Sequence, residues 1–287
     1  LASLKKKVEY ATILGTFQST LTDLKYLRKI WRDNTEQERL LGVSLTGIMD
    51  SELLNDATDT GLEKRLQELR QVAVDTNLGL SDALNIEQST AITCVKPSGT
   101  VSQLVNSASG IHARHSNYYI RTVRGDKKDP LTQFLIDQNI PCEDDVMQPD
   151  NTAVFSFPVE SPEKAVTRND TSALAQLDLW LVYQKHWCEH KPSVTITVKE
   201  DEWLDVGAWV YNNFDNVAGI SFLPHSDHTY KQAPYQECNK KDYLSLAKTM
   251  PDNIDWSLLS DYEVEDNTKG GQELACTADA CEIVDIT

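Results

Sequence analysis

The stretch that decides the fold runs Thr93-Cys94-Val95-Lys96-Pro97-Ser98-Gly99-Thr100-Val101-Ser102. Residues 91–95 are almost all apolar and β-prone, which predicts a buried strand. Behind the turn, apolar residues from Val101 to Ala108 recur at three- and four-residue steps, which is typical of a helix. The sequence therefore predicts a strand, a tight turn, and a helix that begins near Ser98.

This turn has the chemistry of a phosphate site. The first amides of a helix have no acceptor within the helix, and the helix dipole favours an anion at that end. A glycine in the turn lets the backbone come close to a ligand, and neighbouring hydroxyl groups add donors. We predict that a phosphate is bound in the turn formed by Pro97, Ser98, Gly99, Thr100 and Ser102. A plain helix cap is the alternative interpretation.

Strand and helix patterns alternate on both sides of the turn. Apolar periodicity predicts helices over 8–21, 24–31, 62–73, 130–137, 171–190, 201–214 and 243–250. Strands are predicted over 41–48, 91–95, 118–124, 152–159, 194–198 and 217–223. This alternation favours an α/β fold, with a mostly parallel sheet or barrel and a right-handed crossover at each step. Residues 252–271 are acidic and polar, which predicts a flexible linker ahead of the last two cysteines.

Composition and charge limit the classes of protein to which this chain can belong. A chain of 287 residues that is 40% hydrophobic can bury a sizeable core. Its 44 acidic and 27 basic side chains give a net charge of −17, which argues against a nucleic-acid polymer as partner. No apolar run approaches the roughly 18 residues of a membrane span, and no signal peptide is recognised, so we expect no membrane partner and a cytoplasmic location. A first residue other than Met favours a fragment or a processed product.

Two histidines raise the question of a metal. His186 and His190 have metal-ligand spacing on a predicted helix. Cys188, however, lies about 200° round that helix from His186, so it cannot join the same ion. Trp187 also stands where the common metalloprotease pattern has Glu. We therefore expect no metal site, and a metal-binding protein that uses these histidines and the tail thiols remains an alternative.

The six cysteines divide into two groups. In a chain of cytosolic character they favour reduced thiols over a disulfide framework. The isolated ones are expected to pack as small apolar residues, and these are Cys94, Cys142, Cys188 and Cys238. Cys276 and Cys281 differ, because they lie near the end of the chain behind the polar linker with Gly270-Gly271. A dithiol on a flexible arm can enter a buried site and reduce a disulfide there by thiolate exchange, so we predict a redox shuttle.

The turn and the residues after it resemble a known family. The resemblance rests on Pro97-Ser98-Gly99-Thr100-x-Ser102, on Ser109-Gly110-Ile111-His112, and on His115-Ser116-x-Tyr118-Tyr119-Ile120-Arg121-x-Val123-Arg124. These segments resemble the substrate-phosphate loop and following strand of ribonucleotide reductases, above all the monomeric adenosylcobalamin-dependent ribonucleoside-triphosphate reductases. Residues 18–23, 38–48 and 276–281 are similar to the same family. The resemblance runs from end to end, but only to the carboxyl-terminal part of such an enzyme.

This resemblance implies a fold and a set of partners. Residues 1–235 would form the second half of a ten-stranded α/β barrel, and residues 236–287 a cobalamin-side segment with a flexible redox tail. The cofactor would be adenosylcobalamin and the substrate a ribonucleoside triphosphate. Thioredoxin or a similar protein would reduce Cys276 and Cys281. An amino-terminal part of the same enzyme, which would also hold the allosteric sites, is implied as a further partner.

The family's chemistry sets further expectations. In it the cobalt–carbon bond breaks, a cysteine thiyl abstracts the 3′-hydrogen of the ribose, and a cysteine pair supplies electrons. The thiyl motif Asn-x-Cys-x-Glu is absent from this chain, so we expect it upstream and expect the chain alone to be inactive. Phe222-Leu223 takes the place of the tyrosine pair that relays the radical in aerobic iron-dependent reductases. No glycyl-radical signature is present either, and both observations favour the cobalamin class.

Cofactor ligands are less well defined. Cobalamin contacts in the family fall in stretches that match about 110–171 and 230–269 of this chain. Arg121 and Arg124, on the strand after the turn, could face a phosphate or the corrin side chains, and a salt bridge at the barrel rim is the alternative. From another class of function, a non-catalytic phosphate-binding α/β module also remains open.

Overall fold

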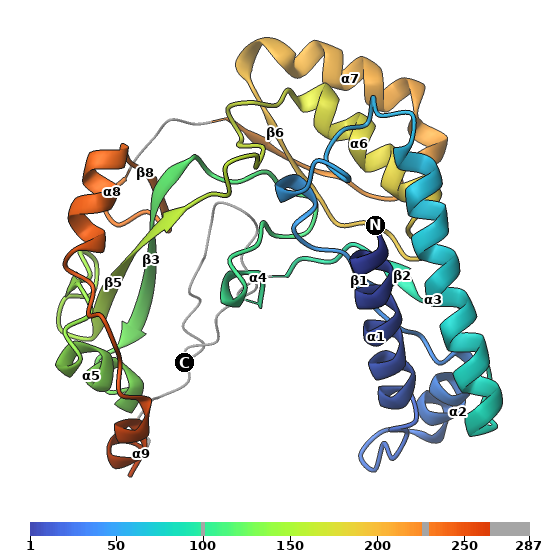
Figure 1. The fold of residues 1–287 in the computed structure, drawn as a ribbon, viewed down its shortest axis with the longest axis horizontal. Helices are drawn as coiled ribbons and strands as arrows, with labels where there is room; N and C mark the ends of the chain where they lie inside the picture. The colour runs from blue at the N-terminus through green and yellow to red at the C-terminus, as the bar shows by residue number, and fades with distance from the viewer. Residues whose placement is uncertain (99–100, 226–229, 265–287) are drawn as a thin grey trace. The chain divides into compact units, whose positions relative to one another are not determined.

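The computed structural model describes residues 1–98, 101–225 and 230–264, and the chain divides into two compact units. Unit 1 contains residues 1–113 and 164–225, and unit 2 contains residues 114–163 and those from 226 onward (Figure 1). From the sequence we expect a boundary after residue 235, between a barrel part and a segment with a redox tail, and this functional division stays a prediction. The two compact units have other bounds, because residues 119–121 pair as a strand with residues 235–237 within unit 2.

Unit 1 is built from helices and two pairs of parallel strands. Its α-helices are α1 (Ala2–Gln18), α2 (Lys29–Glu38), α3 (Leu62–Leu84), α4 (Val101–Leu104), α6 (Ala173–His186) and α7 (Trp203–Asn212). Short 3₁₀ turns are η1 (Ile48–Asp50), η2 (Glu200–Glu202) and η3 (Phe214–Asn216). Strand β1 (Val43–Ser44) pairs in parallel with β2 (Thr93–Cys94), and β6 (Thr195–Val198) pairs in parallel with β7 (Ser221–Pro224). These parallel pairs agree with the expected α/β class.

Unit 2 is an antiparallel sheet with helices. Its strands are β3 (Tyr118–Asp126), β4 (Cys142–Asp144), β5 (Thr152–Glu160) and β8 (Tyr235–Glu237), in the order β4-β5-β3-β8. The helices are α5 (Pro130–Asp137), α8 (Lys240–Ala247), η4 (Trp256–Leu258) and α9 (Leu259–Tyr262). The predicted parallel crossover between strands 118–124 and 152–159 is wrong, because Tyr118 lies opposite Glu160 in an antiparallel ladder. The apolar pattern of one strand carries no information about its neighbour's direction, and 25 residues suffice for either connection.

The ten-stranded barrel stays a prediction. Among the described residues the strands form three small sheets, none of which closes on itself. Within the same residues, no helix combines the length and the apolar character that crossing a membrane requires.

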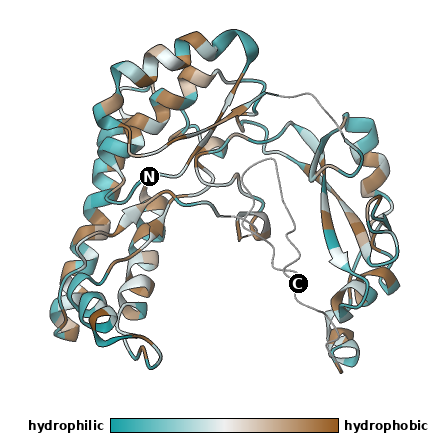
Figure 2. Ribbon diagram, turned by 180° about the vertical axis from the view of Figure 1, so that it is seen from behind, coloured by the Kyte–Doolittle hydropathy of each residue, from teal (hydrophilic) through white to brown (hydrophobic). Residues whose placement is uncertain are grey.

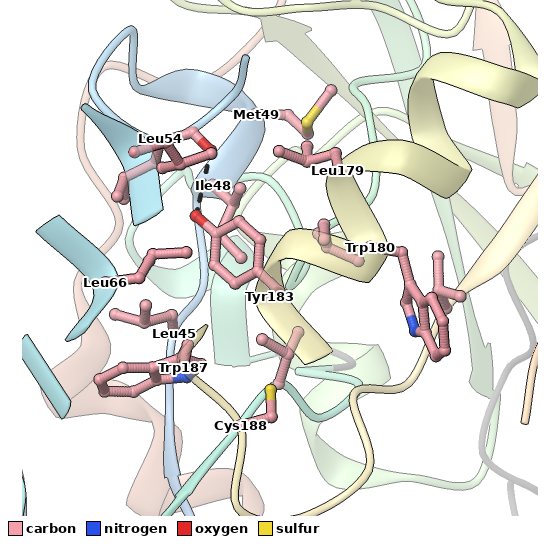
Figure 3. Packing of buried hydrophobic residues seen from close by; sticks show 14 of the residues in the cluster. Leu45, Ile48, Met49, Leu54, Leu66, Leu179, Trp180, Tyr183, Trp187 and Cys188 are labelled. Atoms are coloured by element: carbon pink, nitrogen blue, oxygen red, sulfur yellow. Dashed lines mark hydrogen bonds between the residues drawn. The ribbon is translucent and has the colours of Figure 1, made fainter. Parts of the chain in front are cut away.

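The core of unit 1 lies where α6 meets the segments around β1 and α3 (Figure 3). Trp180, Tyr183 and Trp187 of this region are fully buried. Each also places its polar atom on a backbone carbonyl. The Trp180 indole donates to Pro192 at 3.0 Å, the Tyr183 hydroxyl to Leu54 at 3.0 Å, and the Trp187 indole to Cys94 at 2.7 Å. Large aromatic side chains are therefore buried here without an unsatisfied donor.

Helix α1 buries a different face from the one that its apolar residues predict. Val8 of the predicted stripe is buried, but Leu14, Phe17 and Leu21, the last of which lies beyond the end of α1, are exposed, whereas Thr12 and Thr16 are fully buried. The reason is the packing of α1 against α3, where the Asn77 side chain donates to the Thr16 hydroxyl at 3.0 Å. Figure 2 shows that apolar residues occur along helices of both units. Helix α2 likewise begins five residues later than predicted, at Lys29, and the side chains of Ile30 and Trp31 are exposed.

The helix predicted to run from Ser98 to Ala108 is also shorter than expected. It ends at Leu104, and Val101, Leu104 and Val105 are all exposed. Asn106 adopts a left-handed conformation with φ 47°, and the Ser107 amide bonds back to the Ser102 carbonyl at 2.9 Å. This is the hydrogen-bond pattern that terminates helices at a left-handed residue. The apolar periodicity of the sequence continues to Ala108, but the left-handed conformation of Asn106 ends the helix before that residue.

Glu189 joins the end of α6 to β2. Its carboxylate accepts hydrogen bonds from the amides of Ile92 at 2.8 Å and Thr93 at 3.3 Å, and it contacts Arg70 at 3.2 Å. Burial raises the pKa of the Glu189 carboxyl, but the Ile92 amide and Arg70 outweigh it, and the net pKa is lowered. The charged form is thus favoured in the folded state.

We expect the stability of unit 1 to fall as acid protonates Glu189. A depressed folded pKa contributes stability that is present above the unfolded value of about 4.3 and is lost as pH falls through the folded pKa. Glu189→Gln should lower the free energy of unfolding by about 1–2 kcal/mol at neutral pH and flatten the profile below about pH 4.3. Urea unfolding between pH 3 and 7 measures both effects. Glu87→Gln, at an exposed position, is the matched control, and equal profiles for the two variants would contradict this role.

Candidate functional site

The predicted phosphate turn lies at the carboxyl ends of β1 and β2. Ligands of open α/β sheets bind at this edge, where consecutive parallel strands release their loops. Ser44 and Thr46 come at the end of β1, and Lys96 and Ser98 follow β2. The Lys96 amide donates to the Ser44 hydroxyl at 3.0 Å, which holds the two strand ends together. Ser98 is half-buried, and the other three residues are exposed.

Hydroxyl groups close the loop that leaves this edge and returns to it. The Ser98 and Ser109 hydroxyls lie 2.8 Å apart. Thr46 donates to the Ala108 carbonyl at 3.0 Å and accepts from the Gly110 amide at 2.9 Å, with its Oγ1 3.4 Å from that of Ser98. The result is a group of three hydroxyls, from Thr46, Ser98 and Ser109. Since a phosphate oxygen accepts, a hydroxyl of this group would bind it by donating a hydrogen that is not already used, which Ser98 or Ser109 can supply.

Two further contacts shape the return of the loop. The Asp50 carboxylate accepts from the Ala108 amide at 2.7 Å. Gly110 has φ 54°, and a Cβ there would lie 3.3 Å from the Lys96 carbonyl and 3.4 Å from the Val95 side chain. A larger residue at position 110 would therefore be strained and would push the loop away from β2.

The predicted phosphate ligands differ in burial, and two of the five are not described by the structure. Pro97 is exposed and Ser98 half-buried at the strand ends, and their contact with phosphate stays a prediction. Gly99 and Thr100 lie outside the described residues. Ser102 is fully buried on α4, so its contact with phosphate stays a prediction. Helix α4 has only four residues, and the Val101 amide donates to the Ser98 carbonyl at 2.9 Å, so the helix dipole contributes little here.

Thr46 and Ser109 were not predicted as site residues. Thr46 is 52 residues from Ser98 in sequence, and only the pairing of β1 with β2 brings them together. One signal was present in the sequence, because a polar residue directly after a buried strand in an α/β pattern lies at the ligand-binding edge.

The two arginines proposed as cofactor ligands lie on β3 in unit 2. Arg124 donates to Asp145 at 2.8 Å and to the Gln232 carbonyl at 3.1 Å, so it forms the salt bridge, which is the alternative interpretation of this residue. Burial raises the pKa of Asp145, but hydrogen bonds from the Met147 amide and from Arg124 outweigh it. The net pKa is lowered, so the pair is ionic. Arg121 instead places its guanidinium over the ring of Tyr235, 4.3 Å from the centroid. A contact of Arg121 or Arg124 with a phosphate or a cofactor stays a prediction.

The two histidines with metal-ligand spacing do not share a helix face. Helix α6 ends at His186, so the prediction of a helix through residue 190 is wrong. His186 contacts Gln67 at 2.9 Å, and the His190 ring bonds to the Leu41 carbonyl at 2.8 Å. Within the described residues, no group of three potential ligands has the geometry of a metal site. These histidines connect segments of unit 1.

Four of the six cysteines are described, and all four are free thiols. Cys94 and Cys188 are buried, and burial raises the pKa of both. Burial also raises the pKa of Cys142 and Cys238. A raised pKa keeps a thiol protonated and unreactive. The expected packing role is confirmed for the buried Cys94 and Cys188, whereas for Cys142 it is wrong, because that side chain is exposed. Cys276 and Cys281 lie outside the described residues.

Comparison with known proteins finds relatives that share one name. No family model matches the chain. The adenosylcobalamin-dependent ribonucleoside-triphosphate reductase of Euglena gracilis is 29% identical over 96% of this chain and 37% of its own length. The protein of the same name from Lactobacillus acidophilus is 27% identical over 96% of this chain and 40% of its own. This chain is homologous to the adenosylcobalamin-dependent ribonucleoside-triphosphate reductases.

Two further comparisons agree. A probable adenosylcobalamin-dependent ribonucleoside-triphosphate reductase of Dictyostelium discoideum is 30% identical over 71% of this chain and 27% of its own length. The crystal structure of a B12-dependent class II ribonucleotide reductase superposes with a TM-score of 0.77. That match covers 93% of this chain and 40% of the crystallised one, and at 22% identity it concerns the fold. The chain spans about two fifths of the length of the reductases it matches.

Proposed function

We propose that this chain is part of a vitamin B12-dependent ribonucleotide reductase, which converts ribonucleoside triphosphates to 2′-deoxyribonucleotides by radical chemistry. The homology over 96% of the chain supports the reaction class. The hydroxyls of Thr46, Ser98 and Ser109, gathered at one edge of β1 and β2, support the binding of a phosphate chain there. This arrangement is the main support for the proposal, because it places Ser98 of the 97–102 motif beside two hydroxyls from outside the motif, those of Thr46 and Ser109.

The phosphate turn orients the substrate. Neutral hydroxyls and backbone amides bind phosphate oxygens without distinguishing one base from another. Adenosylcobalamin, when bound, would supply the radical that starts the reaction. Arg121, with its guanidinium against Tyr235, is the described residue that we assign to the cofactor side. Cys276 and Cys281 would then return electrons to the site from thioredoxin or a similar reductant.

An amino-terminal part of the same enzyme is the partner that we propose. Two features of unit 1 support it. Strand β1 has one strand neighbour, β2, within the described residues. Apolar side chains on α1 and α2 are also exposed, among them Leu14, Phe17, Ile30 and Trp31. An open strand edge beside apolar surface is a site for pairing with further chain.

A non-catalytic phosphate-binding module would share the same turn. We separate the two functions by mixing the chain with an amino-terminal piece that carries the thiyl motif. Formation of deoxyribonucleotides with adenosylcobalamin and a dithiol supports the reductase. A mixture that binds ribonucleoside triphosphates without turnover favours the module.

The phosphate turn is tested by substitution in that mixture. Ser98→Ala should weaken binding of each of the four ribonucleoside triphosphates about fivefold, which corresponds to about 1 kcal/mol for one hydrogen bond. Gly99→Val should weaken it more, because a branched side chain blocks close approach of the backbone. Isothermal titration calorimetry measures the dissociation constants. Thr249→Ala removes an exposed hydroxyl bonded to the Leu246 carbonyl in unit 2 and is the matched control. Unchanged affinity in Gly99→Val would show that the turn is structural.

A further inference from the structure

His112 connects the phosphate turn to a strand that the sequence motif does not include. It follows the loop directly and is half-buried in unit 1. Its Nδ1 lies 3.0 Å from the Ser109 carbonyl oxygen. On the other side of the ring, Nε2 lies 3.0 Å from the backbone amide of Thr195, the first residue of β6. One imidazole thus bridges two segments that are 86 residues apart.

The partners of the ring determine its protonation. A carbonyl oxygen only accepts, so Nδ1 must carry the hydrogen that is donated to Ser109. A backbone amide only donates, so Nε2 must be unprotonated to accept from Thr195. The neutral Nδ1–H tautomer satisfies both contacts, whereas the other neutral tautomer and the imidazolium each lose at least one.

Ser109 transmits this restraint to the candidate site. Its carbonyl oxygen is held by the His112 ring and also by the His112 amide at 2.9 Å. Its hydroxyl lies 2.8 Å from that of Ser98. From the opposite side, Thr46 at the end of β1 holds Ala108 and Gly110. The loop is therefore attached to β1 through Thr46 and to β6 through His112.

We propose that His112 is a positioning residue for phosphate binding, which ties Ser109 to the first residue of β6 and thereby holds the Ser98 hydroxyl in place. The part of this inference that concerns phosphate rests on the proposed function. The bridge itself does not, because it is defined by contacts within unit 1. A histidine that only fills space would have no required tautomer and would be replaceable by another side chain of similar size.

The bridge is tested first on the complete 287-residue chain without any ligand. Long-range ¹H–¹⁵N correlation spectra of the His112 ring should show hydrogen on Nδ1 and none on Nε2. A ring with hydrogen on Nε2 overturns the inference. In His112→Ala and His112→Asn the Thr195 amide loses its acceptor and should exchange with solvent about fivefold faster or more. Amides of Leu66 and Leu69, in the buried middle of α3, report whether each variant is folded.

Phosphate binding is tested second, with inorganic tripolyphosphate as the probe. His112→Ala should weaken its binding about fivefold or more. His112→Asn should weaken it less, because the shorter amide can still donate to the Ser109 carbonyl from the position of Nδ1. His190→Gln is the matched control, since that ring also bonds to a backbone carbonyl in unit 1 but at Leu41, ahead of β1. Equal affinity in all variants overturns the positioning role.

The two tests separate this inference from the proposed function. If the unsubstituted chain binds no tripolyphosphate, the phosphate site fails, and with it the role of His112 in binding. The tautomer and the exchange rate of the Thr195 amide then still decide whether the bridge exists. If tripolyphosphate binds but the ring has the other tautomer, the phosphate site stands and the His112 bridge is rejected.

Discussion

Trp187→Ala is expected to lower the free energy of unfolding by about 3–5 kcal/mol. The indole is fully buried among the apolar residues of unit 1, so its removal leaves a large cavity. It also removes the hydrogen bond to the Cys94 carbonyl at 2.7 Å, which leaves that oxygen without its indole donor beside β2. Since whole domains are stable by only about 5–15 kcal/mol, most of the stability of this unit would be lost.

Two further variants separate packing from hydrogen bonding. Trp187→Phe keeps much of the buried volume but loses the donor, so it should cost less than the alanine variant, about 1–3 kcal/mol. Trp31→Ala, on the exposed face of α2, should cost less than about 1 kcal/mol and is the matched control. Urea unfolding followed by circular dichroism provides the comparison. Similar midpoints for Trp187→Ala and Trp31→Ala would refute the central role of this core.

Cys276→Ser and Cys281→Ser are each expected to abolish sustained turnover with thioredoxin in the reassembled enzyme. A disulfide formed in a buried site must be reduced by a dithiol that can reach it, and one thiol alone stops at the mixed disulfide. A prereduced site should still complete about one turnover, because the first reduction consumes electrons already stored there. Rapid-quench measurement of deoxynucleotide per enzyme distinguishes this single turnover from a general loss of activity.

The control for the two tail variants is an exposed thiol of unit 2. Cys142 is exposed on β4 in unit 2, and Cys142→Ser should leave thioredoxin-driven turnover unchanged. A small dithiol that enters the site directly should partly rescue the two tail variants. Full turnover with thioredoxin in either tail variant would exclude the shuttle.

The elements that local sequence determines were predicted well. The apolar patterns at 118–124 and 152–159 lie within β3 and β5, and the predicted helix over 130–137 matches α5. Helix α5 illustrates the reason, because its start is encoded locally. The Asp129 side chain accepts from the Leu131 amide at 2.8 Å, and Pro130 occupies the first helical position. Such signals act over three or four residues and need no tertiary partner.

Direction, buried face and helix length were decided by the tertiary structure. Whether β3 and β5 run parallel or antiparallel depends on a ladder between residues up to 42 positions apart, beginning with Tyr118 and Glu160. Helix α1 buries Thr12 and Thr16 beside Val8 and leaves Leu14 and Phe17 exposed, because α3 offers the Asn77 amide as a partner there. A residue's hydrophobicity shows that burial is favourable, but only the neighbouring elements decide which surface is covered.

Some residues of the candidate site could be recognised from the sequence, and others only from the tertiary structure. The motif from Pro97 to Ser102 and the resemblance to the cobalamin-dependent reductases could be recognised in the sequence alone, because the turn residues are contiguous. Thr46 and the His112 contact to Thr195 could not, because they depend on the parallel pairing of β1 with β2 and on where β6 begins. Sequence thus determined the chemical groups of the turn. Packing of strands and loops distant in the chain decided which other hydroxyls face it and which side chain holds it in place, since hydrogen bonds form only where the backbone brings donor and acceptor to about 3 Å.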